Sequence, residues 1–176
     1  MFEVGDYIVY GNSGVCQVTE IGYLDSSMVR EKKQYYTLIP CYSSGNKIFT
    51  PVDNEKVIMR PVLTMQEAQE LIRQIPEIDS LWIADEKRRE SIYKEAFRTC
   101  DCKELVRIIK TIWLHKKNRQ AAGKKTTAVD DRYFQMAENN LYGELAYSLG
   151  MEKDQVRDHI IQEITLASKE NEPDPV

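Results

Sequence analysis

The sequence has 176 residues, of which 42% are apolar and 30% charged, and it carries a net charge of −4 with a pI of about 5.4. This apolar share is enough for a globular core, and the length fits one large domain or two small ones. The acidic balance argues against a uniformly basic nucleic-acid-binding coat. No apolar run approaches the roughly 18 residues of a membrane span, and the first residues lack the basic and apolar regions of a signal peptide, so we expect a soluble, intracellular protein.

Residues 1–60 have the composition and turn spacing of a small β-domain. Turn-forming residues occupy 11–14 and 43–46, and a longer polar loop spans 25–33. Between them lie five predicted strands, at 6–10, 15–21, 34–40, 47–52 and 56–60. Because Pro51 cannot donate a ladder hydrogen bond, the fourth strand is predicted to lie at a sheet edge or to end there. The short strands favour a strongly bent sheet or barrel.

After Pro61 the hydrophobic period becomes helical. Thr64 and Glu67 form a capping-box pattern, which predicts a helix to about Ile75, stopped by Pro76. Cap residues and apolar stripes predict the remaining helices, at 85–98, about 101–119, 127–150 and 151–167. The sequence therefore predicts a β-domain followed by an all-α domain, with a boundary near residues 60–65.

The net charge conceals a basic middle region. Residues 81–132 carry 14 basic and 8 acidic side chains, whereas residues 133–176 carry 3 basic and 9 acidic ones. A local anion-binding face is one interpretation of the basic region. A set of solvated helix faces is the other, and charge alone favours it.

Catalytic motifs are missing from the sequence. It contains no G-x-S-x-G, H-E-x-x-H or G-x-G-x-x-G. The run at 123–126 lacks the first glycine of a phosphate loop and follows no predicted strand, so an inter-helix turn is the better interpretation. Four cysteines and two histidines are too scattered to favour a zinc site, and Cys16 and Cys41 are predicted to be buried thiols. We expect a binding protein and not an enzyme, with no cofactor, no metal and no small-molecule substrate.

Several runs in the first 54 residues share a distinctive order and spacing. They are Phe2, Gly-Asp-Tyr-Ile-Val-Tyr at 5–10, Gly-Val-Cys-Gln-Val at 14–18, Tyr-Tyr-x-Leu at 35–38 and Ile-Phe-Thr-Pro-Val-Asp-Asn at 48–54. With these runs the sequence resembles the CarD/CdnL/TRCF family of bacterial RNA polymerase-binding domains. The helical remainder is similar to the C-terminal domain of the stand-alone CarD-like regulators, on Trp82, the pair Arg88-Arg89 and Trp113.

The resemblance implies a fold and a partner. It implies a five-stranded Tudor- or SH3-like β-barrel over 1–62, a helical DNA-binding domain over 63–168 and a flexible tail over 169–176. The edge of the fourth strand would pair with the polymerase β subunit. The implied polymerase-binding residues are Lys47, Ile48, Phe49, Thr50 and Pro51. Without the resemblance, Ile48 and Phe49 fit ordinary barrel residues, one facing the core and the other exposed.

The helical domain is expected to contact promoter DNA at the upstream edge of the transcription bubble, with little sequence specificity. Trp82 would insert as a wedge at a distorted base step. The implied phosphate contacts are Lys87, Arg88 and Arg89, with Lys116 and Lys117 as further candidates. A core position for Trp82 and a solvated face for the lysines are the alternatives, and Trp113, on an apolar stripe, is predicted to be in the core.

Together the two contacts would stabilise the open complex. The expected location is the cytoplasm, where the protein would associate with the nucleoid through the polymerase. A protein–protein adaptor without a DNA role is the rival hypothesis. In that case the β-domain would bind polymerase or another partner, and the basic helices would be solvated surface.

Overall fold

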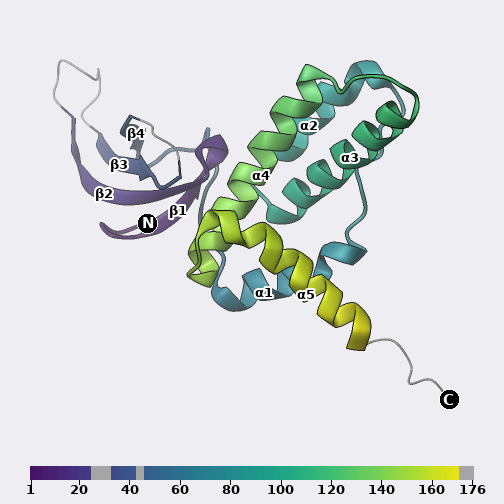
Figure 1. Ribbon diagram of the computed structural model, residues 1–176. Helices are drawn as coiled ribbons and strands as arrows, with labels where there is room; N and C mark the ends of the chain where they lie inside the picture. The colour runs from purple at the N-terminus through teal and green to yellow at the C-terminus, as the bar shows by residue number, and fades with distance from the viewer. Residues whose placement is uncertain (25–32, 43–45, 171–176) are drawn as a thin grey trace. The chain divides into compact units, whose positions relative to one another are not determined.

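The computed structural model describes residues 1–24, 33–42 and 46–170. The chain divides into two compact units, Met1–Val62 and Leu63–Val176, which we call the β unit and the helical unit (Figure 1). The first is a five-stranded antiparallel sheet and the second is built of helices, which confirms the predicted fold class. The predicted loop at 25–33, turn at 43–46 and tail at 169–176 fall largely outside the described residues, although the last helix runs to Glu170.

The strands of the β unit lie in the order β4-β3-β2-β1-β5. Their bounds are β1 (Tyr7–Tyr10), β2 (Val15–Tyr23), β3 (Gln34–Pro40), β4 (Ile48–Pro51) and β5 (Met59–Pro61). A 3-10 turn, η1 (Gly11–Ser13), joins β1 to β2. Gly11 has φ +46° and Gly14 has φ +68°, conformations that glycine adopts without a steric cost. The predicted turn between the first two strands is therefore confirmed.

The alternation of side chains along the strands produces one buried face. Its core consists of Ile8, Cys16, Val18, Tyr36 and Leu38. β4 lies at the edge of the sheet and ends at Pro51, as the sequence predicted. The prediction of a buried Cys41 is wrong, because Cys41 follows the last residue of β3 and is exposed, whereas Cys16 is buried.

The helical unit contains five α-helices and three 3-10 turns among its described residues. They are α1 (Met65–Gln74), η2 (Ile75–Glu77), η3 (Glu86–Arg88), α2 (Arg89–Arg98), α3 (Cys102–Ala121), α4 (Ala128–Leu149), η4 (Lys153–Gln155) and α5 (Val156–Glu170). The predicted caps are confirmed at Thr64, Asp101, Thr127 and the left-handed Gly150. The predicted helices at 85–98 and 151–167 each begin with a 3-10 turn. None of the helices in the described part of the chain is long and apolar enough to cross a membrane.

α3 and α4 pack against each other and form the centre of the helical unit (Figure 1). The buried stripe of α3 runs through Leu105, Ile108 and Ile112 and faces Leu141 and Leu145 of α4 in one core cluster. Trp113 was predicted to lie in this core, but its side chain is 53% exposed. One residue further along an α-helix is about 100° further around it. Trp113 therefore falls beyond the edge of the buried stripe.

Leu63, the first residue of the helical unit, is held by side chains of α4. Its N–H donates to Glu144 Oε1 over 3.0 Å, and Ser148 Oγ donates to its carbonyl over 2.6 Å. The thiol of Cys102 donates to the other oxygen of Glu144 over 3.1 Å. Glu144 is buried, so these hydrogen bonds replace the water that its carboxylate has lost. The start of the helical unit is thus fixed by residues more than 80 positions later.

Candidate functional site

β4 is an edge strand, because β3 is the only strand that pairs with it among the described residues. The N–H of Val52 donates to the carbonyl of Gln34 over 2.9 Å, in the same register as the β3–β4 ladder. Antiparallel pairs alternate between bonded and non-bonded, with a period of two residues. Ile48 and Thr50 therefore direct their backbone groups to β3, together with Val52. The residues between them direct theirs to the open edge.

The open edge of β4 thus presents the backbone of Phe49 and Pro51. Phe49 offers both an N–H and a carbonyl, whereas Pro51 offers only a carbonyl. The Phe49 side chain is 44% exposed, and Lys47 is also exposed. Ile48 packs against the core and Thr50 is buried. Of the five predicted polymerase-binding residues, three therefore face outward and two hold β4 to its own domain.

Trp82 lies on a segment without regular secondary structure, between η2 and η3, and its side chain is 81% exposed. This segment and the η3 turn that follows it contact α3, once on each side of Trp82. The Leu81 N–H donates to Thr111 Oγ1 over 2.7 Å, and Glu86 Oε2 lies 3.4 Å from His115 Nε2. Since Thr111 and His115 are one helical turn apart, the two anchors lie on the same side of α3.

The predicted phosphate contacts next to Trp82 divide into two kinds. Lys87 and Arg88 are exposed on η3, whose first turn is capped by Asp85. Arg89 is buried, and its guanidinium donates to Glu86 and to the hydroxyl of Tyr93. Burial alone would lower the pKa of Arg89, but these hydrogen bonds raise it, so the side chain stays charged inside the protein. Arg89 is therefore not a surface cation, contrary to its predicted role as a phosphate contact.

The two other predicted phosphate contacts lie further along α3. Lys116 Nζ is 2.7 Å from Asp131 Oδ1 and 4.5 Å from the centre of the Phe134 ring. Lys117 Nζ is 5.0 Å from the centre of the Trp113 ring. Lys116 thus already neutralises a carboxylate, and Lys117 is the more exposed of the two.

The position of Lys117 on α3 separates it from the Trp82 segment. Trp113 and Lys117 each follow an anchor of that segment, Thr111 or His115, by two residues. Two residues correspond to about 200° around an α-helix. Trp113 and Lys117 therefore lie on the opposite side of α3 from the anchors, and the structure does not bring them together with Lys87 and Arg88.

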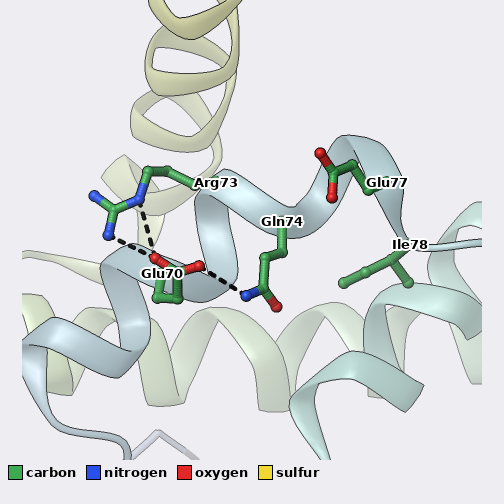
Figure 2. Close-up of a pocket in the computed structure, with 5 residues that line it drawn as sticks. All are labelled: Glu70, Arg73, Gln74, Glu77 and Ile78. Carbon is green, nitrogen blue, oxygen red and sulfur yellow. Dashed lines mark hydrogen bonds and ion pairs between the residues drawn. The ribbon is translucent and has the colours of Figure 1, made fainter.

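A surface depression lies along α1 and η2 (Figure 2). Glu70, Arg73, Gln74, Glu77 and Ile78 line it. Glu70 accepts hydrogen bonds from Arg73 Nη2 over 2.8 Å and from Gln74 Nε2 over 2.7 Å. The bond from Arg73 is the main cause that lowers the pKa of Glu70. These polar side chains bind one another on the helix surface, so the depression does not add a candidate site.

Among the described residues, no three His, Cys, Asp or Glu side chains are arranged to hold a metal ion. Comparison with protein-family models matches residues 2–63 to the CarD-like/TRCF RID domain. The β unit is a CarD-like/TRCF RID domain. This confirms, for this part of the chain, the family that was predicted from the runs in the first 54 residues. No curated protein matches the chain.

The RID domain makes this a transcription-associated protein that binds RNA polymerase. The match covers all five strands, including the open edge of β4. The helical unit lies beyond the matched residues except for Leu63, so the proposed roles of Trp82 and of the cations that follow it rest on geometry and on the sequence resemblance.

Sequence reasoning missed four residues that surround Arg89. They are Glu86, Tyr93, His115 and Asp130. The sequence shows only that these polar side chains lie on predicted helices. It does not distinguish a buried polar side chain from one that faces solvent. Their partners come from three different helices and one 3-10 turn.

Proposed function

We propose that the protein is a transcriptional regulator that binds the β subunit of bacterial RNA polymerase through its RID domain and promoter DNA through its helical unit. The DNA contact would lie near the upstream edge of the transcription bubble and stabilise the open complex. We propose a role by binding alone, without catalysis, in the cytoplasm. The polymerase part is supported by the family match and by the open edge of β4.

The geometry of β4 suggests how the polymerase would be held. A strand of the β subunit added to the open edge can exchange two hydrogen bonds with Phe49 and donate one to the carbonyl of Pro51. The exposed ring of Phe49 adds apolar contact next to these bonds. Such pairing depends mainly on backbone groups, so it places few demands on the partner's sequence.

The observation that carries the DNA contact is the exposure of Trp82, 81% for a large apolar side chain that precedes two exposed cations by five and six positions. Apolar side chains of this kind insert between base steps and stabilise bent or opened duplex. Lys87 and Arg88 can bind phosphates, an interaction without sequence preference that weakens as salt increases. The wedge favours the distorted DNA of the bubble edge over intact duplex, whereas the phosphate contacts add affinity for either form. The difference in affinity due to the wedge shifts the equilibrium toward the open complex.

The test is the lifetime of open complexes formed by bacterial RNA polymerase with the full-length protein. Replacing Trp82 by Ala removes the wedge, and we expect a loss of about 1–2 kcal/mol, or roughly a five- to thirtyfold shorter lifetime. Trp113→Ala is the matched control, since Trp113 is also an exposed tryptophan of the helical unit but lies on the other side of α3.

We expect Trp113→Ala to leave the lifetime unchanged. If the wild-type protein binds polymerase without prolonging the open complex, or if Trp82→Ala has no effect, the DNA contact is wrong. An adaptor that links polymerase to another protein is then the supported function.

A further inference from the structure

Five side chains of the helical unit form a closed ring of hydrogen bonds and ion pairs. Arg89 donates to both oxygens of Glu86 over 2.9 and 2.5 Å, and to Tyr93 Oη over 2.7 Å. Tyr93 Oη donates to Asp130 Oδ1 over 3.1 Å. Asp130 Oδ2 lies 2.6 Å from His115 Nδ1, and His115 Nε2 lies 3.4 Å from Glu86 Oε2. The ring thus returns to the carboxylate at which it began.

Three members of the ring are buried, and the His115 side chain is 15% exposed. Tyr93 and Asp130 have no exposed surface and Arg89 is buried, whereas the Glu86 side chain is 66% exposed. Each charged member faces an opposite charge or a hydrogen-bonding partner, as buried polar groups require. The bond to Arg89 is the main cause that lowers the pKa of Glu86, so this carboxylate is ionised at neutral pH.

The ring joins four elements of the helical unit. Glu86 comes from η3, Arg89 and Tyr93 from α2, His115 from α3 and Asp130 from α4. The helices α2, α3 and α4 pack against one another (Figure 1). The short turn η3 is therefore tied through side chains to three packed helices.

The position of the ring in the sequence is informative. Glu86 and Arg89 are both members, and the two residues between them are the exposed cations Lys87 and Arg88. A bidentate Arg–carboxylate pair fixes orientation as well as distance. Both ends of the two-residue basic segment are thus held to the protein interior, while the segment itself faces solvent.

We propose that this ring is a positioning device that holds Lys87 and Arg88 in the geometry in which they bind DNA phosphates. Glu86, Arg89, Tyr93, His115 and Asp130 are then positioning residues and do not touch DNA. Immobilising a loop on binding costs conformational entropy, and a segment that is already held avoids this cost. The proposal rests on the DNA contact proposed above and deepens it.

Glu86 allows a test with two opposite expectations. Its carboxylate lies next to Lys87 in sequence, and by simple electrostatics its removal should strengthen binding to a polyanion. If the ring positions the cations, its removal should instead weaken binding, although the protein becomes more positive. A role in fold stability alone predicts no loss of DNA affinity while the protein remains folded.

The experiment measures binding of the full-length protein to a forked duplex across a range of salt concentrations. For Glu86→Ala we expect affinity to fall about three- to tenfold, and the slope of log K against log salt to become shallower by about one phosphate contact. Glu95→Ala is the matched control, because Glu95 is an exposed carboxylate of α2 outside the ring. We expect that variant to bind as well as the wild type or better.

Tyr93→Phe is the second variant, since it breaks the ring at a buried link without changing any charge. It should weaken DNA binding in the same direction, with helical content and the polymerase contact unchanged. Higher or equal affinity in Glu86→Ala and Tyr93→Phe, while Lys87→Ala and Arg88→Ala still weaken binding, overturns the positioning role alone. If all four variants bind DNA as tightly as the wild type, or if the wild type does not bind, the DNA contact itself is wrong and the inference falls with it.

Discussion

The open edge of β4 makes one backbone group testable by a single substitution. The N–H of Phe49 points away from β3, so none of the described strands of the RID domain accepts a hydrogen bond from it. Phe49→Pro removes this donor and leaves the ladder to β3 intact. Proline is tolerated on an edge strand when its missing N–H faces solvent, and the residue before it, Ile48, is already extended, as a residue before proline prefers.

The expected loss follows from the hydrogen bond. An incoming strand of the polymerase β subunit would place a carbonyl opposite the Phe49 N–H. That carbonyl would be buried without a donor in the variant, which costs about 1–3 kcal/mol. With tenfold per 1.4 kcal/mol, the dissociation constant should rise roughly five- to hundredfold.

The assay is binding to the isolated β lobe by calorimetry, and Phe49→Ala is the reference. Both variants lose the aromatic ring of Phe49, a residue that is 44% exposed, but only Phe49→Pro loses the donor. Urea unfolding of the two variants should agree within about 0.5 kcal/mol, since neither touches a bond to β3. Equal affinity of the two folded variants would refute strand addition at this edge and leave only a side-chain contact.

Two further predictions concern the stability of the β unit. Gly11→Ala should lower the free energy of unfolding by about 1–3 kcal/mol, because φ is +46° there and an added Cβ would lie 2.6 Å from Val57 Cγ1. The double variant with Val57→Ala should recover the part of this loss that is due to the clash. An unchanged urea midpoint in Gly11→Ala would contradict this reasoning. Burial raises the pKa of Cys16 from its usual 9.0 to about 12. Above pH 9 the unfolded thiol loses its proton while the folded one keeps it, so stability is complete below pH 9 and falls toward pH 12. The decline of the urea midpoint over this range should be shallower in Cys16→Ala, and identical slopes would exclude Cys16 as its cause.

The features that the sequence predicted correctly are those with local signals. The capping box at Thr64, the cap at Asp101 and the left-handed Gly150 each act within a few residues, and all three occur in the structure. The edge position of β4 followed from Pro51, whose missing N–H is also a local property. Such signals were sufficient for the element order and the fold class.

The features that the sequence misjudged depend on packing between distant elements. Arg89 looks like a surface cation beside Arg88, and only α3 and α4, which supply His115 and Asp130, complete the ring that encloses it. Trp113 belongs to an apolar stripe, but the helices that pack on α3 leave it 53% exposed. Neither fact is available from the periodicity of one helix.

The fixation of Leu63 by α4 has a consequence for where this chain can be divided. A helical fragment that starts at Thr64 would lack the N–H that Glu144 accepts, and a buried carboxylate oxygen would lose its partner. It would also leave the Ser148 hydroxyl without its acceptor. Because both bonds use backbone groups of position 63, a recombination event that joins the helical unit to another domain must place a residue other than proline directly before Thr64.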